Sequence, residues 1–263
     1  MKKTVGGLSV LLEGNQKNRA IIFLHGFPYD HTMWHAQIAA LSETYYCVAY
    51  DIRGLGDSSI GDGQFTMESF VDDLELMIGD LKDDKPPILC AFSMGGYIAL
   101  RALERMENKF SALILCDTAA HADNNDAKLR RSDAIKRINA KGLTSFSKHF
   151  IAQCYSDAYK KEHKELVDKR INTSMKFNSI GVKGCVFAML TRNDMTEFLP
   201  SIKIPTLLLC GEHDTLTPPL GMQTMAKQIE GSEFVLIKNA AHMSVVENPE
   251  ESNEAIKAFL AKL

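Results

Sequence analysis

A serine stands where an apolar run of the sequence gives way to a helical pattern, in Ile88-Leu-Cys-Ala-Phe-Ser93-Met-Gly-Gly96. A sharp turn from strand into helix lifts a serine hydroxyl out of a sheet, where it can attack a carbonyl carbon. The backbone passes close by at such a turn, so small residues are needed two positions to either side, and Ala91 and Gly95 satisfy this demand. Because a serine can also simply cap a helix, further residues must support Ser93 as a nucleophile.

A serine hydroxyl is a poor nucleophile at neutral pH and requires a base with an oriented partner. Asp214 lies in Gly211-Glu-His-Asp214 and His242 lies in Asn239-Ala-Ala-His242, each just beyond an apolar run. In an open α/β sheet, catalytic groups gather at the carboxyl ends of the strands. The order Ser, Asp, His along the chain is typical of one class of hydrolytic site. We therefore predict that Ser93, Asp214 and His242 form a catalytic triad.

A loop with a possible catalytic role also follows an apolar run, in Leu24-His-Gly-Phe-Pro28. The tetrahedral intermediate of acyl transfer carries an oxyanion that needs preorganised N–H donors. We predict that the backbone N–H groups of Phe27 and Met94 supply them. For His25 we expect a structural role, in which its ring packs and hydrogen-bonds to hold the loop.

Three apolar residues beside these motifs are candidates for contact with a substrate: Trp34, Phe92 and Met243. Trp34 is the only tryptophan, and its helical pattern makes a place in the core an equal alternative. A substrate that bears a carboxylate would need a cation in the pocket, for which Arg192 is one candidate among many.

The elements that must position these residues are short apolar runs bounded by turn residues, which predict strands. The runs are Leu8–Leu12, Ala20–Leu24, Tyr46–Tyr50, Ile88–Ala91, Ala112–Cys116, Thr206–Cys210 and Glu233–Ile237. Helical periodicity is found over Thr32–Leu41, Met67–Leu81, Gly95–Met106 and Pro249–Leu263. This alternation indicates an α/β fold with a mostly parallel sheet covered by helices on both faces. The two most N-terminal runs leave no room for a helix between them and are expected to form an antiparallel edge.

One long segment, from about Ala119 to Pro200, contains helical stretches but no convincing strand. An insertion of this length between two core strands indicates a helical cap rather than a loop. We predict a core made of residues 1–118 and 201–263 and a cap, or lid, made of residues 119–200. The aromatic residues of the cap, among them Phe146 and Phe150, are expected to pack mostly within the cap.

Composition excludes several classes of protein. The 263 residues are 45% hydrophobic with a net charge of −3, which favours neither nucleic acid nor an anionic membrane as a partner. The six cysteines have no zinc-ligand spacing and fit buried thiols in a reducing cytoplasm. No apolar run is long enough for a membrane span. The chain carries neither a dinucleotide fingerprint nor a P-loop, so we expect no cofactor and no metal.

The motifs together resemble the α/β-hydrolase superfamily over nearly the whole chain. The resemblance rests on HGFP at 25–28, DIRGLGDS at 51–58, AFSMGG at 91–96, GEHD at 211–214 and AAHMS at 240–244. Within the superfamily the chain is similar to the branch of 3-oxoadipate enol-lactonases, small arylesterases and cofactor-free haloperoxidase-type esterases. The resemblance implies an α/β-hydrolase fold and assigns the acid to Asp214, with Glu212 and Asp117 as competitors. By the same resemblance, the turn that follows Asp51 has a structural role and no chemical one.

The activity that this resemblance implies is hydrolysis of a small carboxylic ester or lactone through an acyl-enzyme. Relatives in which a carboxylate displaces a leaving group from carbon have an aspartate at the position of Ser93. Because this chain has a serine there, that chemistry is not expected. C–C bond hydrolysis and perhydrolysis would use the same triad and stay open. A small-molecule receptor on the same fold is the alternative from another class, because fold alone does not decide function. The sequence does not determine the oligomeric state.

Overall fold

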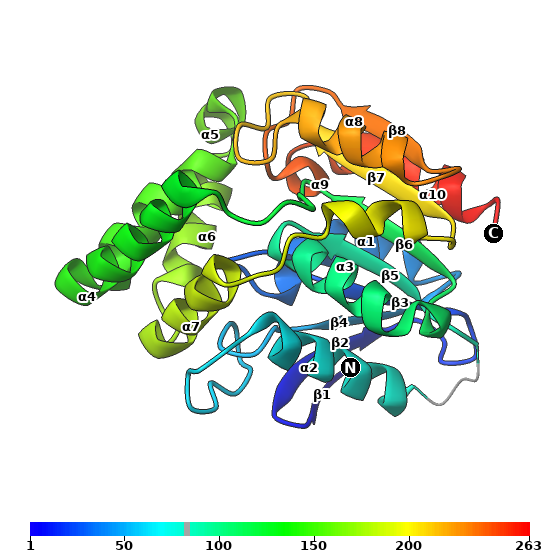
Figure 1. Cartoon of the computed structure of the whole chain (residues 1–263), viewed down its shortest axis with the longest axis horizontal. Coiled ribbons are helices and arrows are strands. Elements are labelled where there is room, and N and C mark those ends of the chain that lie inside the picture. Colours follow the sequence, from blue (N-terminus) through cyan, green and yellow to red (C-terminus); the bar gives the residue numbers. More distant parts are fainter. Residues whose placement is uncertain (82–84) are drawn as a thin grey trace.

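The computed structural model describes residues 1–81 and 85–263, which contain one eight-stranded sheet (Figure 1). Its order is β1-β2-β4-β3-β5-β6-β7-β8. The strands are β1 (Lys2–Val5), β2 (Leu8–Glu13), β3 (Ala20–Leu24), β4 (Tyr46–Tyr50), β5 (Ile88–Phe92), β6 (Ala112–Cys116), β7 (Thr206–Gly211) and β8 (Glu233–Ile237). All seven predicted runs are strands, and β1 is an additional one.

The parallel part of the sheet runs from β4 through β3, β5, β6 and β7 to β8. The predicted antiparallel edge exists, but β1 and β2 form it, and β2 pairs with β4. The expectation that Ala20–Leu24 lies at this edge is wrong, because β3 is in the parallel centre. Gly6 and Gly7 have φ of 55° and 85°, and this backbone allows the two-residue turn that folds β2 back onto β1.

Helices cover both faces of the sheet. Alternate strand residues point to opposite faces: Ile22 and Leu24 pack in one apolar cluster, and Ile21 and Phe23 in the other. The first cluster includes residues of α2 (Met67–Asp80), α3 (Met94–Met106) and α8 (Pro219–Gln228). The second includes residues of the short helix η1 (His31–Trp34), α1 (His35–Leu41), α9 (Ser244–Glu247) and α10 (Pro249–Leu260). The predicted fold class is confirmed.

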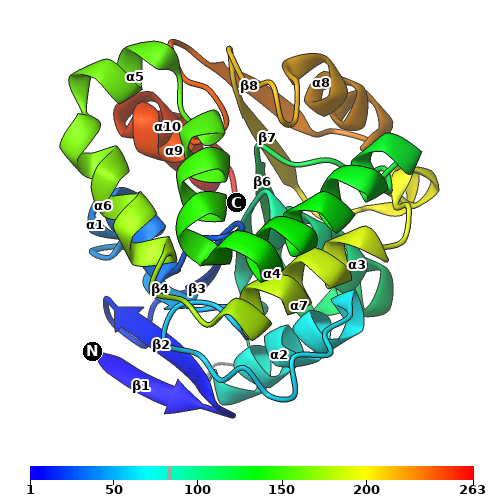
Figure 2. The same cartoon turned by 90° about the vertical axis from the view of Figure 1, so that its left-hand side faces the viewer.

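The helical insertion lies between β6 and β7. It contains α4 (Asn125–Cys154), α5 (Asp157–Glu162), α6 (Lys164–Ser174), α7 (Ser179–Leu190) and the short helix η3 (Thr196–Ser201). Figure 2 shows α4 to α7 as a group of helices on one side of the sheet. α4 is kinked at Gly142, where φ is 70° and ψ is 177°. In the described part of the chain, every helix is too short or too polar to cross a membrane.

Candidate active site

Ser93 lies at the turn between β5 and α3, with φ of 51° and ψ of −113°. A positive φ in a residue with a side chain costs roughly 1–3 kcal/mol and is typical of places where chemistry fixes the backbone. A methyl group added at Gly95 would lie 2.6 Å from the carbonyl oxygen of Leu24. The start of α3 can therefore approach β3 only because no side chain intervenes there. The steric demand inferred from the motif is present in the structure.

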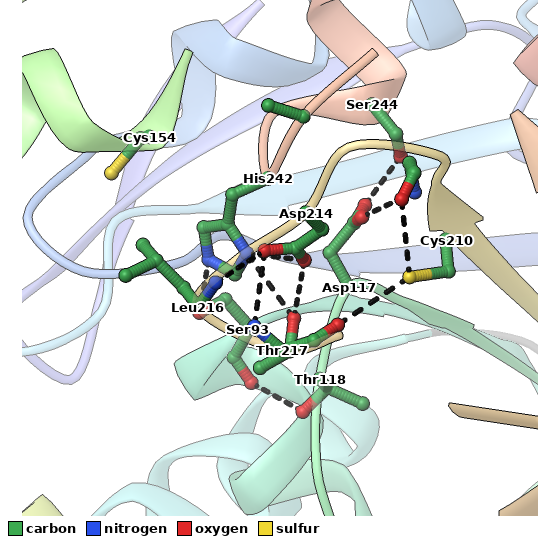
Figure 3. A network of polar contacts seen from close by, with 12 residues as sticks. Ser93, Asp117, Thr118, Cys154, Cys210, Asp214, Leu216, Thr217, His242 and Ser244 are labelled. Carbon is green, nitrogen blue, oxygen red and sulfur yellow. Dashed lines mark hydrogen bonds and ion pairs between the residues drawn. The ribbon is translucent and has the colours of Figure 1, made fainter. Parts of the chain in front are cut away.

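Three side chains from three separate loops form a continuous chain of hydrogen bonds (Figure 3). Ser93 Oγ lies 3.0 Å from His242 Nε2, and His242 Nδ1 lies 2.8 Å from Asp214 Oδ2. An ionised carboxylate can only accept, so Nδ1–H donates to Asp214 and Nε2 can accept from the Ser93 hydroxyl. The structure thus brings together the three residues predicted as a triad, in the arrangement that a serine nucleophile needs.

The carboxylate of Asp214 is held by four donors. Its Oδ1 accepts the N–H groups of Leu216 and Thr217, and its Oδ2 accepts the Thr217 hydroxyl and the His242 ring. Burial favours the neutral acid, but the positive charge that His242 carries when protonated and these hydrogen bonds outweigh it, so the pKa of Asp214 lies below its ordinary value. Asp214 is therefore ionised beside the histidine. Thr217 is not among the residues predicted from the sequence, although a threonine three residues after an aspartate is placed to hydrogen-bond back to that turn.

Asp117, a competitor for the acid, is buried beside the triad at the end of β6. Its Oδ1 accepts the Gly211 N–H at 2.8 Å, and its Oδ2 accepts the hydroxyl of Ser244. Complete burial, together with repulsion from Asp214, raises the pKa of Asp117 well above its ordinary value. Asp117 therefore links the turn before Asp214 to the loop after His242, and its raised pKa favours the uncharged form of this carboxyl group. This geometry favours Asp214 as the partner of the histidine.

The remaining competitor, Glu212, is bonded to other residues than the histidine of the triad. One of its carboxylate oxygens accepts the backbone N–H of Asn239 at 3.2 Å, in an exposed contact. Among the described residues, the side-chain hydrogen bonds of His242 go to Ser93, Asp214 and Thr217. Glu212 therefore has no part in the chain of hydrogen bonds.

One group of potential metal ligands occurs among the described residues, and it consists of Asp117, Asp214 and His242. Their ligand atoms lie within 4.8 Å of one another. Nδ1 of His242 carries a proton that it donates to Asp214, so it has no lone pair for a metal ion, and the raised pKa of Asp117 disfavours a second charged ligand. These residues fit a hydrogen-bond network better than a cation site, and the expected independence from metal stays a prediction.

The loop at Leu24–Pro28 runs directly beside the serine. A methyl group added at Gly26 would lie 3.1 Å from Ser93 Cβ. Within the described part of the chain, the N–H groups of Phe27 and Met94 donate no hydrogen bond. Unpaired N–H donors on this loop and at the start of α3 are what a developing oxyanion requires. The structure thus places both predicted donors near Ser93, and their catalytic role stays a prediction.

His25 is fully buried and has a hydrogen bond at each ring nitrogen. Nε2 accepts the Ile52 N–H at 2.8 Å, so Nδ1 carries the proton and donates to the Gly26 carbonyl at 2.8 Å. Burial lowers the pKa of His25, which keeps the ring neutral. The ring therefore joins the loop to the end of β4, as the structural interpretation predicts.

The three candidates for contact with substrate are all fully buried. Trp34 packs on Phe23 and Phe92, with ring centroids 5.3 Å and 6.5 Å away. The Phe92 ring lies 5.0 Å from the His242 ring, and Met243 belongs to the same apolar cluster as Trp34. This placement favours packing behind the site, and a role in substrate binding stays a prediction.

Arg192 lies outside the chain of hydrogen bonds, at the C-terminal end of the insertion. Its guanidinium is 2.6 Å from Asp123 and lies 4.1 Å from the centre of the Tyr97 ring. It lines a cavity of about 260 Å³ between α2, α3 and the base of the insertion. Asp123 also pairs with Arg131 at 3.0 Å, so this one carboxylate does not neutralise both guanidinium groups, and a role of Arg192 in binding a substrate carboxylate stays a prediction.

Known proteins resemble this chain in both sequence and fold. A family model described as the alpha/beta hydrolase fold matches residues 19–249. 3-Oxoadipate enol-lactonase 1 of Acinetobacter baylyi is 29% identical over 256 residues, which are 97% of this chain and 94% of that protein. A putative non-heme chloroperoxidase of Synechocystis sp. is 23% identical and aligns over 96% of this chain and 95% of its own length. A solved thermophilic esterase from Thermogutta terrifontis is 31% identical, with a TM-score of 0.92 over 100% of this chain and 98% of that one.

The matched segment covers most of the chain, so the chain belongs to the α/β-hydrolase fold family. It is an enzyme of that fold. The resemblance inferred from the motifs, including its branch of enol-lactonases, esterases and haloperoxidase-type proteins, is confirmed.

Proposed function

We propose that this chain is a serine hydrolase that cleaves a small carboxylic ester or a lactone. The observation that carries the proposal is the chain of hydrogen bonds from Ser93 Oγ through the His242 ring to Asp214. The similar proteins described as an enol-lactonase and an esterase support a carboxylic ester as the bond that is cleaved.

The proposed reaction begins when Ser93 Oγ attacks the carbonyl carbon and His242 Nε2 accepts the serine proton. Asp214 stabilises the imidazolium, and the N–H groups of Phe27 and Met94 stabilise the oxyanion. His242 then protonates the leaving oxygen as the C–O bond breaks, which leaves an acyl group on Ser93. A water molecule, deprotonated by His242, then attacks this acyl group. The bond between the acyl carbon and Ser93 Oγ breaks, His242 returns the proton to Oγ, and the carboxylic acid is released.

The helical insertion, residues 119–200, would act as a lid over this site. A lid can enclose a small substrate and exclude bulk water. We keep the division into this cap and a core of residues 1–118 and 201–263 as part of the proposal. The six cysteines are all buried and unpaired, and this supports a reducing compartment such as the cytoplasm.

A nucleophile-directed probe tests the proposal. A fluorophosphonate should label Ser93, and Ser93→Ala should abolish labelling and lower ester hydrolysis by about 10⁴-fold or more. Ser201→Ala is the matched control, because Ser201 is exposed at the end of η3. Labelling at another serine, or full activity in Ser93→Ala, would refute the assignment.

The same purified protein can be tested for the alternative reactions. C–C bond hydrolysis and perhydrolysis would use the same side chains, so a panel of lactones, aryl esters, diketones and peroxide distinguishes them by rate. A receptor would bind one of these ligands with negligible turnover. Rapid turnover of an ester or a lactone is the result that the proposal requires.

A further inference from the structure

One arm of α4 contacts the loop that carries a proposed oxyanion donor. The kink at Gly142 separates this arm, residues Leu143–Cys154, from the rest of α4. The rings of Phe146 and Phe150 stack on each other, 5.6 Å apart and 14° from parallel. Each also packs against Phe27, at centroid distances of 5.8 Å and 5.7 Å. These two aromatic residues therefore pack on each other within the cap, as expected, and also on the core loop at Phe27.

The C-terminal end of the same arm contacts the loop that carries the base. The carbonyl of Cys154 accepts the N–H of Met243, the residue after His242, at 3.1 Å. Figure 3 shows Cys154 at the end of a helix on the His242 side of the network. Cys154 also lies against Tyr29, two residues after Phe27. A single helical arm thus bridges the two loops on which the proposed catalysis depends.

Contacts with α6, another helix of the cap, brace this arm. Ser147 Oγ and Ser174 Oγ of α6 are 2.9 Å apart and buried. Arg170, also in α6, donates to the carbonyl of Thr32 at 2.9 Å, and Thr32 lies in η1, just after the Phe27 loop. The arm is therefore fixed to the core at the Phe27 loop, at η1 through α6, and at the His242 loop.

We propose that Phe146 and Phe150 are positioning residues that hold the Phe27 N–H in the geometry of the oxyanion hole. The inference rests on the proposed function, because it assigns how the proposed oxyanion hole is held. Among the residues that the structure describes, none accepts a hydrogen bond from the Phe27 N–H, so no such bond fixes its direction. A donor contributes to catalysis only when it is held within about 0.5 Å of the productive geometry, and the two rings supply this restraint by packing.

The test measures steady-state kinetics of Phe146→Ala and Phe150→Ala with p-nitrophenyl acetate. We expect kcat to fall about tenfold, less than the 10²–10³-fold loss typical when a donor is removed outright, while KM changes little. Inhibition by a small boronic acid, which forms a tetrahedral anion on the serine, should weaken by a similar factor. The pH profile should keep its shape, because His242 and Asp214 are unchanged.

Phe187→Ala is the matched control. Phe187 is a cap phenylalanine on α7 that is 50% exposed, so this variant should keep the kcat and boronic acid affinity of the unmodified protein. Phe146→Leu retains an apolar side chain and should recover part of the lost kcat. If an alanine variant fails to fold by circular dichroism, the leucine variants at both positions carry the test, with a smaller effect in the same direction.

Two outcomes would overturn the inference. An increase in KM alone, with kcat and boronic acid inhibition unchanged, would make the rings a pocket wall. Unchanged kinetics in folded variants would make them ordinary cap packing. Failure of the proposed function is separate, because it would appear as an unlabelled Ser93 in the unmodified protein.

Discussion

The carboxyl edge of the sheet and the helical cap hold their residues by different means. At the sheet edge, backbone hydrogen bonds fix the loops: Ser93 N donates to Cys116 O at 3.0 Å, and His213 N donates to Ala240 O at 2.8 Å. The cap helices satisfy most of their own backbone, so side chains such as Phe146 and Arg170 make many of their contacts with the core. Substitutions at the carboxyl edge should therefore alter the chemical step. Substitutions in the cap should alter how firmly the catalytic loops are held and which substrates the site accepts.

The two regions also differ in charge. Residues 119–200 contain 15 Lys and Arg and 9 Asp and Glu, whereas the rest of the chain contains 15 Lys and Arg and 24 Asp and Glu. The cap is thus positive and the core negative, although the whole chain is close to neutral. A field of this kind acts on the encounter with charged ligands rather than on the fold.

The largest expected effect lies at the sheet edge and compares two neighbouring carboxyl groups. Asp214→Asn should lower kcat by about 10⁴-fold with little change in fold, because an amide can favour the wrong histidine tautomer and cannot stabilise the imidazolium. Asp117→Asn should lose far less, since the raised pKa of Asp117 favours an uncharged side chain there and an amide oxygen can still accept the Gly211 N–H. Both variants are to be measured with a short aryl ester. A severe loss in Asp117→Asn with an active Asp214→Asn would reverse the assignment of the acid.

Sequence patterns predict the strands and loops of the carboxyl edge well, because each signal lies within a short stretch of the chain. The strand at Ala20–Leu24 is an uninterrupted apolar run, and Ser93 follows another, so both can be found without knowing the fold. The neighbours of β3 could not be found this way, since pairing joins residues far apart in the chain. The partners of Asp117 are 94 and 127 positions away, and no pattern within a loop encodes them.

The cap is predictable only as a helical region. Its periodicity indicates helices, but the kink at Gly142 is a backbone conformation that one glycine among 17 does not reveal. The contact of Phe146 with Phe27 depends on that kink and on the placement of the whole arm. Helix position in the cap follows from side-chain packing between distant residues, which composition and period do not specify.

The second prediction concerns the cap and the size of the substrate. A closed pocket typically holds a few hundred Å³, so kcat/KM should fall steeply from p-nitrophenyl acetate to the palmitate. Once the pocket is full, each further methylene should cost about tenfold or more, because it has no space beneath the lid. Variants at the sheet edge should lower all these rates together. A maximum at the longest chains would indicate an open groove, and the interpretation of the insertion as a closed lid would be wrong.

The smallest expected effect is on stability, and it distinguishes the contribution of Asp117 to the pH dependence from that of Asp214. The pKa of buried Asp117 is raised, so above about pH 4, the ordinary value for Asp, the folded chain keeps a proton that the unfolded chain releases. The free energy of unfolding therefore falls as pH rises through this window, by up to about 1.4 kcal/mol for each pH unit. Asp214 has the opposite sign: its lowered pKa stabilises the fold above about pH 4, and this contribution is lost in stronger acid.

Asp117→Asn removes only the effect of Asp117, so urea unfolding at pH 5 and pH 8 should show this variant gaining stability over the unmodified protein as pH rises. A difference that stays constant between the two pH values would mean that Asp117 is ionised in the folded chain, and the neutral link between the acid and base loops would have to be abandoned.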